Sequence, residues 1–450
     1  MANGVLALGR RRPSPEVEGA APPFRVADVF RDRHTTFKFA AILGLQMGQV
    51  FPAAFFGLML TAIYREKGLP LDMFWVFVLP SIPTWLRPLW APLVDGVGWK
   101  RIGVRKTWFI PCTLFGAAAY ISLAWVEPEL DALWIIIGIL IVKTTFMTTQ
   151  DIAIDGYMVE NLRDEERGVG AAVMDIGRNI AQFGSWAGIA WVYGKYGWPA
   201  ATWLAASMLV LFSLPGVLRP EPPPPVQARA SRSRGERPSL LRLLRREDTR
   251  YVLPLVMLIS FAGSLMPALF VAFLVDKGFS VGQIGPLIFA PATLIGTLIG
   301  ASATAVFLNR FGYKATILTA AFLMIPSVIP IIWLGSLENP SLIIVFLVTL
   351  NAIILPSFMG VAMAASRLKW ASKTQAATDY TTTIVAATAA AAAALAIGGV
   401  IAEHLGWYGY FAFAGVFITL ACFVFYALFD KIEGIVEARD RNEVLQRPQE

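Results

Sequence analysis

Runs of apolar residues recur along the whole chain, separated by short polar stretches. An α-helix rises 1.5 Å per residue, so a run of about 20 residues crosses the hydrocarbon core of a bilayer. With 56% hydrophobic and only 15% charged residues among 450, the chain is too apolar for a water-solvated globule. We therefore predict an all-α polytopic membrane protein with twelve transmembrane helices. The expected spans are 37–62, 72–93, 107–126, 132–158, 168–193, 199–218, 251–275, 283–307, 314–334, 341–363, 379–402 and 407–429.

A polar stretch divides these spans into two halves of six. It opens with Pro220 and Pro222–Pro225, which favour extended polyproline geometry, and continues into ARASRSRGERP, so it is predicted to be a linker. SLLRLLRRED at its end, and FRVADVFRDRHTTF before the first span, mix apolar and charged residues in the manner of helices lying on a membrane surface. The predicted organisation is a tail with a surface helix (1–36), a first half (37–218), a linker (219–250), a second half (251–429) and a tail (430–450).

Lysine and arginine are distributed unequally between the two sides that these spans define. They concentrate in the amino-terminal segment, in the linker and in the other loops of the same side, whereas the opposite side carries only Arg65, Lys67, Lys195 and Lys277. Cytoplasmic loops of membrane proteins carry an excess of basic residues. We expect both termini and the linker to be cytoplasmic, and the net charge of +7 then requires no nucleic-acid partner.

Several chemistries are disfavoured by the residue inventory. Cys112 and Cys422 both lie within apolar runs, so we expect no disulfide framework and no thiolate metal site. No G-x-x-x-x-G-K-[ST] loop occurs, so the chain is expected to use a gradient, with no cofactor. Asp151 and Asp155, four residues apart, resemble half of a magnesium–diphosphate site, but the only acid within the predicted spans of the second half is Asp379. An intramembrane enzyme is therefore disfavoured, and a receptor with a transporter fold stays open as an alternative.

The span over 132–158 contains the most informative charges. A charge at the bilayer centre costs on the order of 2.5 to 3.5 kcal/mol, so it requires a partner or a function. Lys143 lies near the midplane with no acid four residues away on its own helix, which favours contact with water and with an anionic group of a substrate. Gln150 lies seven residues later on nearly the same face, and Asp151 and Asp155 follow on an adjoining stripe. The alternative for the acids is structural pairing with Arg178 and Arg87.

Other polar residues fall inside the spans, and we expect them to share one central cavity with Lys143. Burial raises the pKa of a carboxyl group and a nearby cation lowers it, so a moving cation beside an aspartate is a means of loading and releasing a proton. Both histidines, His34 and His404, lie outside the spans, which leaves this role to carboxylates. The candidate substrate-binding residues are Lys143, Gln150, Gln46, Gln49, Arg178, Asn179, Asn351 and Tyr380, and the candidate proton-coupling residues are Asp151, Asp155, Asp175 and Asp379.

The loops after the second and eighth spans resemble each other. APLVDGVGWKRIGVRK and AVFLNRFGYK both resemble the signature that the major facilitator superfamily carries between the second and third helices of each half. Its recurrence at equivalent places indicates a duplicated six-helix repeat, whereas a merely basic loop is the plainer alternative. We expect Asp95, Arg101 and Arg105 to form a charge cluster that latches and releases during transport, with Arg167 as a further gating candidate.

A longer stretch, TTQDIAIDGYMVENLRDEERGVGAAVMDIG, resembles the AmpG-type permeases of the peptide/acetyl-coenzyme A transporter family within that superfamily. The matching residues are Gln150, Asp151, Asp155, Glu165, Glu166, Arg167, Gly168, Gly170, Ala171 and Ala172. The resemblance implies a major facilitator fold and proton-driven import of a bulky solute, anhydromuropeptide, across the bacterial inner membrane by alternating access. Asp379-Tyr380-Thr381 stands where those permeases are mostly apolar, which raises a related branch that imports ferric siderophores. The expected partners are the small-molecule substrate, protons and membrane lipid, and we expect a monomer.

Overall fold

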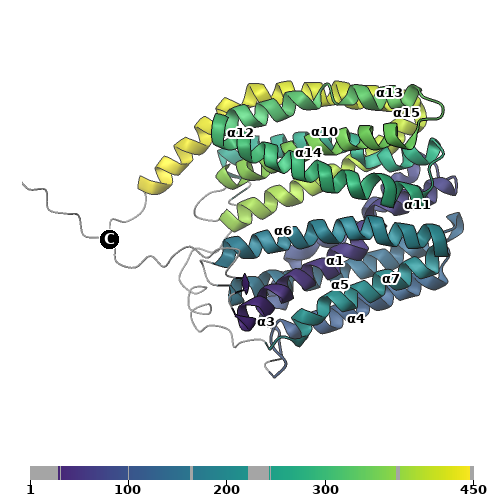
Figure 1. Ribbon diagram of the computed structural model, residues 1–450. Helices are drawn as coiled ribbons and strands as arrows, with labels where there is room; N and C mark the ends of the chain where they lie inside the picture. The colour runs from purple at the N-terminus through teal and green to yellow at the C-terminus, as the bar shows by residue number, and fades with distance from the viewer. Residues whose placement is uncertain are drawn as a thin grey trace, which may run out of the picture.

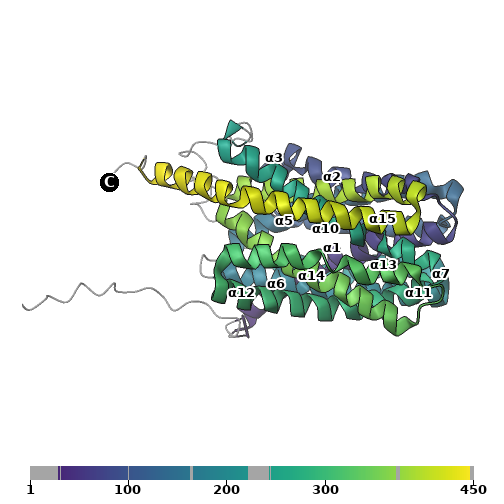
Figure 2. The same ribbon diagram turned by 90° about the horizontal axis from the view of Figure 1, so that it is seen from above.

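The computed structural model describes residues 29–30, 32–99, 101–162, 166–220, 243, 245–370 and 376–445. Over these ranges the chain is almost entirely helical and forms no β-strand. The long helices lie roughly side by side in one bundle, and the two halves of the sequence form two groups of helices packed against each other (Figure 1; Figure 2). We call the end at which α1 begins and α15 finishes the terminal end, and the opposite end the distal end.

The helices follow the predicted order. Those of the first half are α1 (Arg33–Glu66), η2 (Leu71–Ser81), α2 (Ile82–Leu86), η3 (Arg87–Leu89), α3 (Ala91–Gly96), α4 (Lys106–Ser122), η4 (Leu123–Trp125), η5 (Leu130–Ala132), α5 (Leu133–Asn161), α6 (Arg167–Gly184), η7 (Ser185–Ile189) and α7 (Ala190–Leu218). Those of the second half are α10 (Glu247–Asp276), α11 (Val281–Gln283), η9 (Ile284–Phe289), α12 (Ala290–Met324), α13 (Val328–Ser336), α14 (Leu342–Trp370) and α15 (Ala376–Leu445). Most of the predicted linker lies outside the described residues, as does part of each predicted surface helix. The described ends of these two segments belong to α1, which begins at Arg33, and to α10, which begins at Glu247.

Three glycines interrupt what otherwise run as continuous helices. Gly197, Gly312 and Gly406 have φ values of 82°, 76° and 65°, a left-handed conformation that glycine adopts without a steric penalty. They fall between predicted spans, at the points where the chain was expected to turn. Nine helices or joined helices in the described ranges are long and apolar enough to cross a membrane. The total of twelve crossings stays a prediction.

The span predicted over 72–93 is not one regular helix. It is divided into η2, α2, η3 and α3. Pro80, Pro83, Pro88 and Pro92 fall within it, and proline has no backbone N–H for the helical ladder and clashes with the preceding turn. The composition was apolar enough for a span, but the prolines break its geometry.

The turns after α1 and α10 share one sequence pair and one backbone conformation. Lys67-Gly68 follows α1 and Lys277-Gly278 follows α10, and both glycines are left-handed. In each turn the glycine N–H donates to the carbonyl oxygen three residues earlier, that of Arg65 in the first half and that of Val275 in the second. The same sequence pair and the same bonds at the same place support two copies of one repeat.

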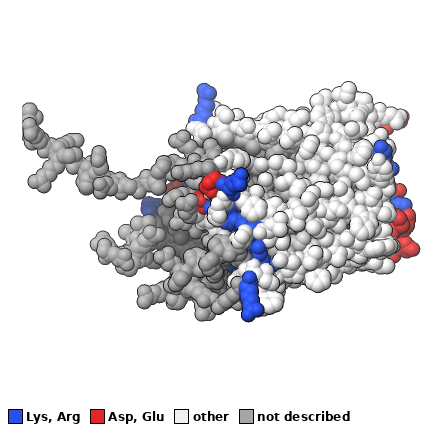
Figure 3. All heavy atoms as spheres, turned by 60° about the horizontal axis from the view of Figure 1, so that its bottom comes forward, with Lys and Arg blue, Asp and Glu red and all other residues white. Residues whose placement is uncertain are grey.

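The surface is arranged as a multi-pass membrane protein requires. Figure 3 shows the charged side chains of one face gathered at the two ends, with a broad band of other residues between them. Trp125 and Trp134, beside the distal turn between η4 and α5, are both exposed, as is common for tryptophan at a membrane–water interface. At the terminal end, Asp32 caps α1 by accepting the backbone N–H of Thr35 at 2.8 Å, and this bond lowers the pKa of the Asp32 carboxyl group.

The last helix continues beyond the expected membrane span. α15 runs to Leu445, so residues 430–445, predicted as tail, are helical. Glu433 accepts the indole N–H of Trp370 at 2.6 Å and pairs with Lys369, and Arg439 lies 2.5 Å from Asp248. This extension therefore packs against the ends of α10 and α14.

Candidate functional site

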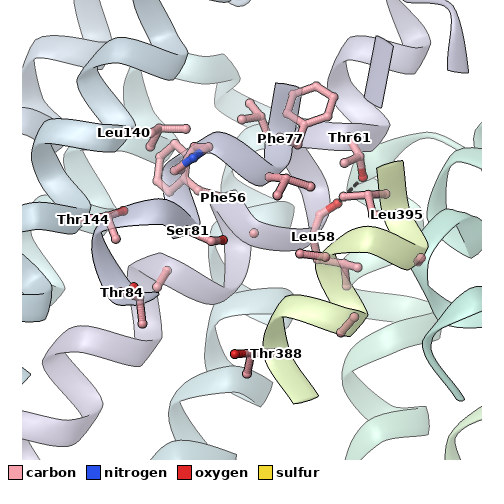
Figure 4. A pocket seen from close by; sticks show the side chains of 18 of the residues that line it. Phe56, Leu58, Thr61, Phe77, Ser81, Thr84, Leu140, Thr144, Thr388 and Leu395 are labelled. Carbon is pink, nitrogen blue, oxygen red and sulfur yellow. Dashed lines mark hydrogen bonds between the residues drawn. The ribbon is translucent and has the colours of Figure 1, made fainter. Parts of the chain in front are cut away.

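A cavity of about 530 Å³ lies between the two halves (Figure 4). Its wall comes from α1, η2, α2 and α5 of the first half and from α10 and α15 of the second. The hydroxyl groups on this wall belong to Thr61, Ser81, Thr84, Thr144, Ser264 and Thr388. Its larger apolar side chains include Phe56, Leu58, Phe77, Leu140 and Leu395.

Lys143 is the one charged residue among the described residues that line this cavity. Only 8% of it is exposed, and within the described chain its Nζ has no hydrogen bond and no acidic partner. Nζ lies over the Tyr120 ring, 5.5 Å from the ring centroid. A buried cation without an acidic partner in the described chain is costly, so this position is chemically suited to an anion.

Tyr120 forms the support behind Lys143, and the sequence did not single it out. The residue is fully buried, and its hydroxyl has no hydrogen-bond partner in the described structure. Its ring lies 5.0 Å from that of Phe56, a residue of the cavity wall. Tyrosines and phenylalanines are common in apolar helices, so only the fold reveals this arrangement.

The predicted glutamine cluster ties helices together at some distance from the cavity lining. Gln49 donates to Gln150 at 3.1 Å and to the Met147 carbonyl at 3.2 Å. Gln150, which is fully buried, donates to the Thr113 hydroxyl at 2.6 Å. These bonds join α1, α5 and α4. Gln46 is also buried, and its Oε1 has no partner in the described chain.

The remaining predicted substrate-binding residues are spread over the bundle, and none is among the described cavity-lining residues. Asn351 donates to the Ser327 carbonyl at 3.0 Å, which joins α14 to the start of α13. Arg178 on α6 is exposed, while Asn179 and Tyr380 are half-buried. Their roles in substrate binding stay predictions.

Two of the predicted proton-coupling residues lie at the terminal side of α5. Arg87 Nη1 is 3.0 Å from Asp151 Oδ2, which is the pairing weighed as the structural alternative. Asp155, one turn further on, is exposed. Its carboxyl group interacts electrostatically with the charges of Asp151, Arg87 and Arg178. The side chain of Asp175 lies outside the described structure.

Asp379 belongs to a separate cluster in the second half. Arg246 Nη2 lies 2.7 Å from Asp379 Oδ2 and 2.9 Å from Asp248 Oδ2. Arg439 completes the cluster through Asp248. This network joins the start of α10 to both parts of α15, so Asp379 occupies a position that links helices.

Among the gating candidates, Arg105 has the clearest environment. It precedes α4 and is almost fully buried, and its guanidinium group packs on Gly156 of α5. Arg101 is exposed in the preceding turn. Asp95 lies in α3 and Arg167 is the first residue of α6, but their side chains lie outside the described structure. A latch among these residues stays a prediction.

Replacing Gly156 with alanine is expected to destabilise the terminal end of the first half. A Cβ atom there would lie 2.3 Å from Arg105 Cζ, so the guanidinium group must shift, and Arg105 is buried and has little room to do so. Overpacking of this kind costs about 1–3 kcal/mol. Thermal melting in detergent should show a lower midpoint for Gly156→Ala, whereas Gly138→Ala on the same helix, with nothing within 4 Å of its Cβ position, should melt like the parent protein. Equal melting of the two variants would contradict this account.

The two halves are joined closely at the distal end. Arg65 of α1 makes a two-bond pair with Asp276 of α10, with distances of 2.7 and 2.8 Å. The carboxylate of Glu403 on α15 accepts the backbone N–H of Leu71 at 2.8 Å, and that of Glu66 accepts the N–H of Val281 at 2.9 Å. These contacts hold the two halves together at the distal end.

Comparison with known proteins identifies the family. The family model described as Major Facilitator Superfamily matches residues 42–378. The chain belongs to the Major Facilitator Superfamily. A solved structure of the nucleoside transporter NupG superposes with a TM-score of 0.66 at 13% identity, covering 86% of this chain and all of that one, and supports the major facilitator fold. Membership in this family confirms that the chain is a transporter rather than an enzyme.

Relatives of known name agree with the resemblance to AmpG-type permeases. The "Anhydromuropeptide permease" of Escherichia coli K12 is 25% identical over 49% of this chain. The match covers 45% of that relative, which is about half of its length. A "Putative transporter AmpG 4" of Rickettsia conorii is 24% identical over 91% of this chain and 99% of its own length. The predicted resemblance is thus confirmed. These names give no support to the ferric-siderophore alternative.

Proposed function

We propose that this major facilitator protein imports an anionic, bulky polar solute, most simply an anhydromuropeptide, from the distal to the terminal end of the bundle. The observation that carries the proposal is Lys143, a cation without an acidic partner in the described wall of the cavity between the halves. A peptide stem ends in a carboxylate, which such a cation binds through charge-assisted hydrogen bonds. The hydroxyls of Ser81, Thr84 and Thr144 suit the amide and sugar groups of the same molecule.

The direction of import rests on the distribution of basic residues. The loops and termini of the terminal end carry most of the lysine and arginine, which supports a cytoplasmic location for that end in a bacterial inner membrane. The distal end would then face the periplasm. Closure at the distal end, with Arg65 bound to Asp276, supports assignment of this conformation to the stage at which the cargo is released inward.

Proton coupling is proposed to run through the acids of α5. The Arg87–Asp151 pair at 3.0 Å and the neighbouring Asp155 place two carboxyl groups and a cation together. Protonation of Asp151 would remove the charge that holds Arg87, and movement of Arg87 would in turn release the proton. A carrier that links this exchange to the opening of either end would couple uptake to the gradient.

Asp151→Asn is expected to abolish accumulation driven by a pH gradient, because asparagine cannot carry the proton. Exchange of labelled for unlabelled cargo needs no net proton movement, so it should persist in proteoliposomes. Asp131→Asn, at the exposed distal turn, is the matched control and should behave like the parent protein. Gradient-driven accumulation that is unchanged in both Asp151→Asn and Asp175→Asn would refute the carboxylate mechanism.

The cargo is tested by uptake into whole cells. Labelled anhydromuropeptide should accumulate in cells that express the protein, and a protonophore should prevent it. A ferric siderophore, offered in parallel, should not accumulate. Uptake of the siderophore without uptake of the muropeptide would replace the proposed cargo with the alternative.

A further inference from the structure

The wall of the cavity is asymmetric. The first half contributes Lys143 and the aromatic rings of Phe56 and Phe77. The second half contributes no charged residue to the described lining. Most of the lining residues of the second half lie on one face of α15. The first half can therefore contact a cargo through a cation and aromatic rings, and the second half through uncharged side chains.

The α15 face consists of Thr388, Ala391, Ala392 and Leu395. Spacing of three, one and three residues places these four side chains on one side of an α-helix. In Figure 4, Thr388 and Leu395 lie on the ribbon of α15 opposite Ser81 and Thr84 of the first half. The two central residues, Ala391 and Ala392, each present only a methyl group to the cavity. A leucine or isoleucine at either position would occupy part of the cavity volume.

Close helix packing does not explain the two central alanines. Small residues in membrane helices commonly allow neighbouring helices to approach. On α15, Ala390 and Ala394 have that role, since both are buried. Ala391 and Ala392 are half-buried and border the cavity, so their small size leaves volume for something that enters it.

We propose that the α15 face sets the upper size limit of the cargo, while Lys143 on the opposite wall holds its charged group. This inference rests on the proposed function in taking the cargo to be a bulky anion. Ala391 and Ala392 would accommodate its uncharged bulk, and larger side chains there would restrict the cavity to smaller anions. One additional methylene group in an apolar pocket already changes discrimination about 10- to 200-fold.

The first test measures space in the cavity without reference to the cargo. Thr388→Cys provides a thiol on the α15 face, in a protein whose two buried cysteines, Cys112 and Cys422, are replaced by alanine. Labelling rates are compared for a small and a bulky anionic thiol reagent. Ala392→Leu should slow the bulky reagent at least about tenfold and the small one less than about twofold. Ala393→Leu, outside the described lining, is the matched control and should slow neither.

The second test uses the proposed cargo. Ala392→Leu should reduce uptake of the disaccharide–peptide about tenfold or more while uptake of a small anhydro-sugar acid stays within about twofold of the parent protein. Equal effects on bulky and small probes, or no effect on either in the labelling test, would overturn the size limit. If the parent protein carried no muropeptide, the proposed function would fail, and the labelling test would still decide whether the α15 face limits what enters.

Discussion

Lys143→Met is expected to reduce uptake of the anionic cargo at least about 30-fold. Removing one partner of a desolvated charge pair costs about 2–5 kcal/mol, because the other charge is left without compensation in a dry site. Methionine keeps most of the length and apolar character of the side chain, so the packing on Tyr120 should survive. Initial rates in proteoliposomes, measured over a range of cargo concentrations, would show the loss mainly as an increase in KM.

Two further variants sharpen this test. Lys143→Arg keeps the charge and should retain part of the uptake. Lys195→Met removes a cation that lies 5.1 Å from the Trp191 ring, outside the described cavity lining, and should transport like the parent protein. A Lys143→Met protein with normal uptake and normal KM would show that the cargo is not anchored by this cation.

Gly399→Leu is expected to prevent closure of the distal end and to reduce uptake at least about tenfold. A Cβ atom at Gly399 would lie 2.1 Å from the backbone carbonyl oxygen of Leu71, and a backbone atom cannot rotate away as a flexible side chain can. Because α15 and η2 belong to different halves, the clash is relieved most simply by separation of the halves at that end. The carrier would then stay open on the distal side and could not complete its cycle.

Distances between spin labels would show this directly. Labels at Lys67→Cys and Lys277→Cys, which follow α1 and α10 at the distal end, should move apart in Gly399→Leu. Gly360→Leu on α14, where nothing lies within 4 Å of the Cβ position, should leave both the distances and the uptake unchanged. Unchanged distances and uptake in Gly399→Leu would mean that the contact with Leu71 is not part of a closed state.

The sequence predicted the fold well because the bilayer imposes strong rules on composition. Length and hydropathy located the helices, and the breaks expected after residues 193, 307 and 402 fall close to the left-handed glycines Gly197, Gly312 and Gly406. The stretch 72–93 shows the limit of this reasoning. Its hydropathy is that of a span, but its regularity depends on backbone hydrogen bonds that its prolines cannot make.

The site was predicted only where a charge made the signal strong. Lys143 lies on the cavity wall as expected, because an unpaired cation has few tolerable locations in a membrane protein. Gln49 and Gln150 lie away from the described lining, because uncharged amides also satisfy each other between helices. Ala391, Ala392 and Thr388 gave no signal, since lipid-facing, helix-facing and cavity-facing positions can all be small or apolar, and only the packing of the helices distinguishes them.

The location of the cavity charge on one half has an electrical consequence. An empty carrier moves Lys143 as a net positive charge relative to the bilayer, whereas a carrier whose Lys143 is paired with the carboxylate of its cargo moves a neutral pair. The transmembrane potential does work of about 2.3 kcal/mol on each elementary charge per 100 mV, scaled by the fraction of the field that the charge crosses. The contribution of Lys143 to the voltage dependence would then fall on the return of the empty carrier, whereas the proton on Asp151 would make its own contribution in the loaded step.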